Sequence, residues 1–198
     1  MLKRVFDIFF SIFALLIFLP FGLLLALIIT FESRGGVFYR QERIGQFSKP
    51  FKLLKFRSML TGADKNGLLT VGMNDSRITK SGFFIRKYKL DEMPQFINVL
   101  MGAMSIVGPR PEVKKYVDLY TEEQRQILNV KPGITDYASL EYFKENEILG
   151  KATNPEEAYI HEVMPHKIQL NQKYLNNPTI TNDLKIIILT ISRLFSGR

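Results

Sequence analysis

The hydrophobic positions of this chain are concentrated near its N-terminus. Of the 27 residues from Val5 to Phe31, all but five are apolar, and positions 8–31 carry no charge. The exceptions are Asp7, Ser11, Pro20, Gly22 and Thr30. As one helix, at about 1.5 Å per residue, the segment would be ~40 Å long and could cross a hydrocarbon layer of ~30 Å. The pattern predicts a membrane-embedded segment over residues 1–33 and a separate domain over residues 34–198.

Pro20 lies near the middle of this segment and affects how it can sit in a membrane. Proline removes a helical hydrogen bond, so we expect the helix to break or kink there. Basic residues flank both ends, with Lys3 and Arg4 before and Arg34 after, and the positive-inside tendency places both flanks in the cytoplasm. A re-entrant helix broken at Pro20 satisfies that tendency, whereas a straight span places Lys3 outside; composition leaves both open. No small-residue cleavage motif follows, which argues against a cleaved signal peptide.

Beyond this segment the pattern predicts an α+β domain that is mainly helical. Two strand-like runs, Val37–Ile44 and Phe51–Phe56, flank a turn and predict a small β-hairpin. Residues 58–81 are rich in Gly, Asn, Asp and Thr and predict a loop. Helical segments are predicted at 82–101 with an interruption at 91–94, at 113–120, after the capping box Thr121–Gln124, and at 156–175 with a break at Pro165.

A final apolar pattern marks one face of a helix near the C-terminus. Its members are Leu184, Ile187, Ile188, Ile191 and Phe195. Such an amphipathic face either packs on a core or lies at a membrane interface. Core packing is the favoured alternative.

Composition narrows the chemistry. The chain has 198 residues and a net charge of +8, so anionic partners are expected, such as nucleic acid, phosphorylated ligands or acidic lipid. It contains no Cys, which excludes disulfides, thiolate nucleophiles and Cys-ligated metals, and only two His, His161 and His166. Carboxylates, hydroxyls and basic residues remain to carry any reaction.

Asp91 and Glu92 are the first candidates. They precede Pro94, and because proline is tolerated in the first turn of a helix, both carboxylates are expected at a helix N-terminus. Residues 77–89 just upstream contain five basic residues and no acid. A carboxylate held ionised beside basic groups can attack phosphorus, and its neighbour can hold Mg²⁺. Helix capping and ion pairing explain most such pairs, so this pair alone does not establish catalysis.

Gly108-Pro-Arg-Pro111 is a second candidate. Pro109 and Pro111 restrict the backbone on both sides of Arg110, which would present a guanidinium with little conformational freedom. That planar group suits bidentate binding of phosphate. A rigid surface loop is the alternative.

Four ordered motifs carry a resemblance. They are Lys55–Met59, Leu90–Leu100, Met104–Pro111 and Lys131–Thr135. Together these motifs resemble the bacterial sugar transferases, the monotopic polyprenyl-phosphate phosphoglycosyl transferases. The resemblance covers essentially the whole chain and is to the minimal, PglC-like form, which lacks a long multi-span N-terminal extension.

The resemblance implies a reaction in which a UDP-sugar gives its phosphosugar to polyprenyl phosphate and releases UMP. Asp91 would attack the sugar-proximal phosphate and form a covalent intermediate. Glu92 would help to hold Mg²⁺, and Arg110 would bind phosphate. Lys55, Arg57 and Arg86 are weaker candidates for the same electrostatic role. Implied partners are phospholipid membrane and downstream glycosyltransferases, at the cytoplasmic face of the bacterial inner membrane.

The sequence departs from the family pattern at two places. Leu19-Pro20 stands where the family has Ser-Pro, so the membrane break would rest on Pro20 alone. Asp136 replaces a Gly that often follows Pro-Gly-Ile-Thr, which affects that loop. Small stand-alone relatives often use N-acetylated amino sugars, including N,N'-diacetylbacillosamine, but no residue here fixes the sugar.

Two other functions are weighed against this one. A membrane-anchored basic module would bind nucleic acid or anionic lipid; however, no recognisable nucleic-acid-binding motif is present, and no nucleic-acid partner is expected. A phosphohydrolase would pass the phosphosugar to water instead of lipid.

Overall fold

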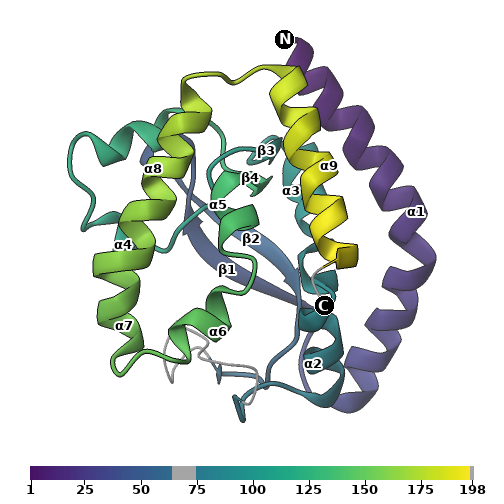
Figure 1. Ribbon diagram of the computed structural model, residues 1–198. Helices are drawn as coiled ribbons and strands as arrows, with labels where there is room; N and C mark the ends of the chain where they lie inside the picture. The colour runs from purple at the N-terminus through teal and green to yellow at the C-terminus, as the bar shows by residue number, and fades with distance from the viewer. Residues whose placement is uncertain (64–74, 197–198) are drawn as a thin grey trace.

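The computed structural model describes residues 1–63 and 75–196, and it places helices around two small pairs of strands (Figure 1). The strands are β1 (Phe38–Ile44), β2 (Pro50–Phe56), β3 (Ser105–Val107) and β4 (Gly133–Thr135). The α-helices are α1 (Leu2–Glu32), α2 (Lys80–Lys87), α3 (Gln95–Leu100), α4 (Lys114–Val117), α5 (Tyr137–Glu141), α6 (Glu145–Leu149), α7 (Pro155–Ala158), α8 (Met164–Leu175) and α9 (Ile180–Ser196). Shorter turns are η1 (Gln46–Ser48), η3 (Leu90–Glu92), η4 (Gln124–Asn129) and the π-helical η5 (Tyr159–Val163). These elements confirm a mainly helical α+β protein.

Helix α1 is one continuous helix that includes Pro20, so the break expected there is not a loss of helical structure. Figure 1 instead shows α1 changing direction about halfway along its length. The helix is long and apolar enough to cross a membrane by length and composition. Its buried residues are Asp7, Ser11, Ala14 and Ile29, which lie toward its two ends. The helix therefore packs on the rest of the protein along one side, most closely toward its ends, while most apolar residues of its middle are exposed.

Polar contacts hold the N-terminal end of α1. The Lys3 ammonium donates to the Asp183 carboxylate on α9 at 2.5 Å and to the carbonyl of Val107 at 3.1 Å. Arg4 donates to the carbonyls that end α3, at Val99 and Leu100. A buried Asp183 carboxylate without its partner would be costly, so this ion pair fixes the position of the first turn.

Asp7, one turn further along α1, attaches the helix to β3. Its carboxylate accepts hydrogen bonds from the Ser105 hydroxyl and from the backbone N–H of Ile106. Asp7 is therefore an acidic residue that the apolar segment can contain because it is buried and hydrogen-bonded to β3.

Arg57 holds the other end of α1. Its guanidinium donates to the backbone carbonyl of Ile29 in the last turn of α1 and to those of Ser33 and Arg34 just beyond the helix. Ile29 packs nearby with Phe56 and Ile85.

The hairpin is confirmed, with β1 and β2 antiparallel and Tyr39 opposite Lys55. The parallel pair β3–β4 was not predicted, because each strand has only three residues and shows no alternation. Both strands lie within the motifs 104–111 and 131–135, so two motifs far apart in sequence are neighbours in space.

The helical predictions are confirmed in outline, with three differences. The segment 82–101 is interrupted as expected, between α2 and α3. The helix predicted at 113–120 is shortened to α4. In the capping box, each of Thr121 and Gln124 accepts the other's backbone N–H through its side-chain oxygen. The element that follows is the 3-10 turn η4 and not an α-helix. The chain does not break at Pro165, which lies in the first turn of α8, where a missing N–H is tolerated, and the π-helical turn η5 directly precedes this helix. Residues 64–74 of the predicted loop lie outside the described residues.

Helix α9 packs on the core, as the favoured alternative expects, but it does so through Ile186 and Ile187 and not through most of the marked face. Of that face only Ile187 is buried, and Leu184, Ile188, Ile191 and Phe195 are exposed. The buried side runs through Asp183, Ile186 and Ile187. Apolar residues occupy more than one face of α9, so their period cannot identify the inner face; the ion pair of Asp183 does.

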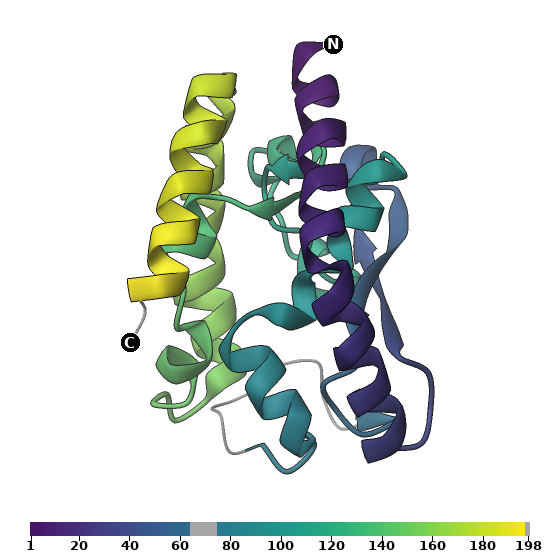
Figure 2. The same ribbon diagram turned by 90° about the vertical axis from the view of Figure 1, so that its right-hand side faces the viewer.

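Two larger apolar clusters form the core. One joins the N-terminal half of α1, α3, β2, β3 and α9, and includes Val99, Met104 and Ile186. The other lies among α4, η5 and α8, and includes Tyr116 and Ile168. Figure 2 shows α1 crossing in front of the strands, on the first of these clusters. The segment that carries Arg110 runs between the two clusters.

Candidate active site

The turn that carries Asp91 and Glu92 connects α2 to α3. Lys89 has a left-handed backbone (φ 56°), which ends the preceding turn and directs the chain into η3. Both carboxylates precede α3 as predicted, although they lie in this 3-10 turn and not in the helix itself. A positive φ at a non-glycine residue is strained and is common at functional sites.

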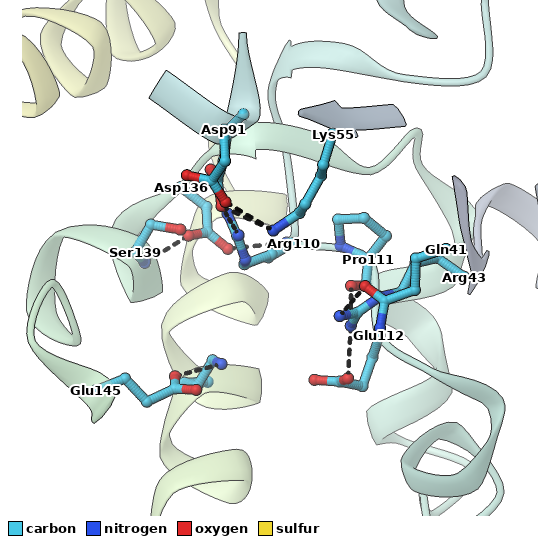
Figure 3. Close-up of polar contacts among 12 residues, drawn as sticks. Gln41, Arg43, Lys55, Asp91, Arg110, Pro111, Glu112, Asp136, Ser139 and Glu145 are labelled. Carbon is cyan, nitrogen blue, oxygen red and sulfur yellow. Dashed lines mark hydrogen bonds and ion pairs between the residues drawn. The ribbon is translucent and has the colours of Figure 1, made fainter. Parts of the chain in front are cut away.

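Two cations converge on the carboxylates. Lys55 Nζ on β2 lies 3.2 Å from Glu92 Oε1 and 3.8 Å from Asp91 Oδ2. Arg110 forms an ion pair with Glu92 through both of its terminal nitrogens. Within the described part of the chain, the Asp91 carboxylate accepts no hydrogen bond, and it lies beside Lys55 (Figure 3). Glu92 therefore accepts bonds from both cations, whereas the Asp91 carboxylate accepts none from the residues that the structure describes.

The two neighbouring carboxyls have pKa values displaced in opposite directions. Burial raises the pKa of Asp91, and the charge of Glu92 adds to this, while Lys55, Arg86 and Lys89 oppose it. Burial also acts to raise the pKa of Glu92, but Arg110 and Lys55 hold it well below its ordinary value. The basic neighbours thus act as predicted, but burial of Asp91 outweighs them.

The pKa values of Lys55 and Arg110 are also displaced. Burial lowers the pKa of Lys55, against the opposing charges of Glu92 and Asp91. The charge of Glu92 raises the pKa of Arg110. Arg110 is a permanent cation, and Lys55 is the more easily discharged of the pair.

The backbone around Arg110 is fixed at three successive residues. The Pro109 carbonyl accepts from Gly133 N–H at 3.0 Å, and the Pro111 carbonyl accepts from Arg43 at 3.1 Å. Between them, Arg110 N–H donates to Asp136 Oδ2 at 3.0 Å, while Asp136 Oδ1 caps α5 (Figure 3). The rigidity predicted from Pro109 and Pro111 is therefore reinforced by a side chain that the family pattern replaces with Gly.

Two glycines make this arrangement possible. A Cβ on Gly133 would lie 2.1 Å from the backbone nitrogen of Gly108, and one on Gly108 would lie 2.4 Å from the carbonyl oxygen of Lys131. No other residue fits at either position. This contact brings the two motifs together and sets the start of the Arg110 loop.

The structure does not bring two predicted site residues to this centre. Arg57 is buried and commits its guanidinium to the end of α1, as described above. Arg86, in the last turn of α2, lies near enough for its charge to lower the pKa of Asp91 but contacts neither carboxylate. Lys55, Asp91, Glu92 and Arg110 are the predicted residues that meet.

Sequence reasoning missed a supporting network beneath Arg110. The Glu112 carboxylate accepts from Arg43 at 2.9 Å, from its neighbour's N–H and from the Tyr159 hydroxyl. The position of Glu112 directly after Pro111 is the only sequence feature that could have marked it. No sequence feature marks Arg43 or Tyr159, because they lie in β1 and η5, outside the motifs.

The donor chemistry of this turn fits Mg²⁺. Carboxylate oxygens are its usual protein ligands, and it is commonly held by one or two of them together with substrate phosphates. Asp91 and Glu92 supply two such groups, and Asp91 has unused lone pairs. No group of three acidic or His residues that could hold a metal by itself occurs among residues 1–63 and 75–196.

The long, exposed, apolar helix α1 suggests membrane association. The largely buried carboxylates Asp91 and Glu92, beside Lys55 and Arg110, form a site suited to an anionic, phosphate-bearing ligand. Residues 1–197 match the family described as bacterial sugar transferase. The chain belongs to this family, which favours the first of the functions predicted from the sequence over the basic binding module.

Individual relatives support the assignment. The chain is 36% identical to the UDP-glucose:undecaprenyl-phosphate glucose-1-phosphate transferase of Escherichia coli (strain K12), over 100% of this chain and 41% of that protein. It is 34% identical to an Aeromonas hydrophila UDP-N-acetylgalactosamine-undecaprenyl-phosphate N-acetylgalactosaminephosphotransferase, over 99% and 44%. It is 38% identical to the exopolysaccharide production protein PSS of Rhizobium leguminosarum bv. phaseoli, over 100% and 97%. The chain thus spans less than half of the first two relatives but nearly all of the third.

Proposed function

We propose that this protein transfers a sugar 1-phosphate from a UDP-sugar to polyprenyl phosphate, such as undecaprenyl phosphate, and releases UMP. The names of the E. coli and A. hydrophila relatives support these substrates. The observation that carries the proposal is the pairing of Lys55 and Arg110 with adjacent buried carboxylates, one of which has no hydrogen-bond donor in the described chain.

Asp91 is the proposed nucleophile. A carboxylate oxygen of Asp91 forms a bond to the sugar-proximal phosphorus, and the bond from that phosphorus to the bridging oxygen breaks, so UMP leaves with the electron pair. An oxygen of polyprenyl phosphate then attacks the same phosphorus and returns Asp91 as a carboxylate. The Asp91 carboxylate accepts no hydrogen bond in the described chain and suits attack better than Glu92, which Arg110 and Lys55 hold in place.

The other residues would bind and neutralise phosphate. Arg110 can exchange the Glu92 carboxylate for phosphate oxygens, since both groups can accept two hydrogen bonds from one guanidinium. Lys55 lies next to both carboxylates and would face the attacked phosphate, with Arg86 contributing long-range charge. Glu92, with Asp91, would hold Mg²⁺, which supplies neutralisation of the diphosphate charge when bound.

We further propose a re-entrant α1 on the cytoplasmic face of the bacterial inner membrane. Both ends of α1 are held to the same body, by Lys3, Arg4 and Asp7 at one end and by Arg57 at the other. A straight span would separate those ends by the membrane thickness. The bend in the apolar middle is where the helix would turn back (Figure 1).

Cysteine labelling tests this topology, because the chain contains no Cys. Leu2→Cys and Gly36→Cys are exposed positions beyond the two clamped ends, and Leu19→Cys is an exposed position in the middle. We expect a membrane-impermeant thiol reagent to label Leu2→Cys and Gly36→Cys only from the cytoplasmic side, and Leu19→Cys from neither. Periplasmic labelling of Leu2→Cys would show a straight span.

The sugar is the next question. The relatives' names include glucose and N-acetylgalactosamine, and N,N'-diacetylbacillosamine is a further candidate. A panel of UDP-sugars, assayed for UMP release with and without polyprenyl phosphate, identifies the donor. UMP release sustained without acceptor would indicate the phosphohydrolase instead, and absence of release with every donor would contradict the transferase.

A further inference from the structure

A polar cavity of about 150 Å³ adjoins Arg110 on the side away from the carboxylate pair. Arg110 and Glu112 line it from the proline loop, Glu145 from α6 and Lys167 from α8. Asp91, Glu92 and Lys55 are not among its walls. In Figure 3 Arg110 lies between Asp91 and the residues Glu112 and Glu145. Arg110 therefore joins the carboxylate pair to this cavity.

We propose that this cavity binds the nucleotide half of the donor, the part that leaves as UMP. The inference rests on the proposed function, whose reaction sets the direction in which UMP must leave. In phosphoryl transfer the attacking and leaving oxygens lie roughly in line on opposite sides of phosphorus. With Asp91 attacking from one side, the nucleotide lies on the other, toward the cavity.

The position of the cavity in the fold supports the same assignment. Its walls come from the region of α4, α6, η5 and α8, whereas α1 lies on the opposite side of the molecule (Figure 1). A lipid acceptor reaches the site from the side of the membrane helix. A water-soluble nucleotide approaches from the other side, where the cavity lies.

The walls also have the chemistry of a nucleotide site. Arg110 and Lys167 are cations that can pair with the phosphate of UMP. Glu145 accepts one side-chain bond, from Lys167 at 2.7 Å, among the residues that the structure describes. Its remaining lone pairs can accept from ribose hydroxyls, as acidic residues do in dinucleotide sites. Glu112 is already saturated by Arg43 and Tyr159, so it shapes the cavity and does not bind ribose.

The test uses the full-length protein in lipid nanodiscs and UMP as the probe. We expect wild-type protein to bind UMP about tenfold more tightly than 2′,3′-dideoxy-UMP, the difference of one charge-assisted hydrogen bond. Glu145→Ala should remove that preference. Lys167→Gln should raise the Kd for UMP and the KM for UDP-sugar by about tenfold, with the KM for polyprenyl phosphate unchanged. Lys173→Gln, an exposed residue on the same helix, is the matched control and should change none of these.

The comparison of the two nucleotides on wild-type protein needs no variant, so it holds even if a substitution prevents folding. Equal affinity for UMP and 2′,3′-dideoxy-UMP, or an equal effect of Lys167→Gln and Lys173→Gln, would overturn the inference. Failure of the proposed function has a different signature, namely no UMP release from any UDP-sugar by wild-type protein.

Discussion

Two arginines of the motifs, the buried Arg57 and the half-buried Arg110, have opposite kinds of partner. Arg57 donates to backbone carbonyls of Ile29, Ser33 and Arg34, which no ligand can replace. Arg110 pairs with the side-chain carboxylate of Glu92, an anion whose place a phosphate can take. Sequence alone makes both candidates for binding phosphate, with Arg57 the weaker of the two. The partner distinguishes a residue that builds the fold from one that is available to substrate.

Removal of the Arg110 side chain should have the largest effect on activity. Arg110→Met is expected to lower kcat/KM for UMP release by about 10²–10³-fold, the size typical of losing one preorganised group that stabilises developing charge. Arg110→Lys should recover only part of it, because an ammonium cannot replace a bidentate guanidinium. Steady-state kinetics on folded protein measure this. If Arg110→Met keeps activity within threefold of wild type, Arg110 has no role in the reaction.

The matching substitution at Arg57 should act on stability. Arg57→Met leaves three carbonyls without their charged donor, and we expect the free energy of unfolding to fall by about 2–4 kcal/mol. Activity per folded molecule should stay within a few-fold of wild type. Thermal unfolding in detergent and active-site titration give the two values. A folded but inactive Arg57→Met protein would break the contrast with Arg110.

Asp136→Asn tests whether the backbone of Arg110 matters separately from its charge. An Asn can still cap α5, but only one of its side-chain positions accepts, so the bond to Arg110 N–H is lost. We expect kcat/KM to fall about tenfold, as for one charge-assisted hydrogen bond. Asp136→Ser, which also caps helices, is the control and should behave alike. If kcat/KM is unchanged in both variants, Asp136 acts only as the cap of α5 and not as a support of Arg110.

The smallest effect concerns the pH dependence of the covalent step. Because attack needs ionised Asp91 and burial raises its pKa, UMP release should rise with pH through a value above the ordinary 3.8. Lys55 is among the charges that lower this pKa, so Lys55→Met should move the acid limb to higher pH. The pH profile of the first-turnover rate shows this. A limb that moves to lower pH in Lys55→Met would contradict the assigned environment.

The sequence predicts what depends on local pattern. The apolar helix, the hairpin and the interruption before α3 follow from composition, alternation and Pro94. What it misses depends on tertiary contacts, such as the three-residue strands β3 and β4, the inner face of α9 set by Asp183, and the commitment of Arg57 to α1. For the site, Asp91, Glu92, Lys55 and Arg110 are brought together as predicted. Asp136 holds the backbone of Arg110, and Glu112 holds Arg43 against the Pro111 carbonyl; no local pattern reveals either contact.

The central claim is that Asp91 forms a covalent bond to the phosphosugar. Intact-protein mass spectrometry after a rapid cold quench of protein and UDP-sugar, without lipid acceptor, tests it directly. We predict near-stoichiometric UMP and a mass increase of one phosphosugar on a peptide containing Asp91, both absent in Asp91→Asn; Glu92→Gln should slow the adduct without moving it. An unmodified mass and no UMP from protein that is active once polyprenyl phosphate is added would contradict the claim and indicate direct transfer.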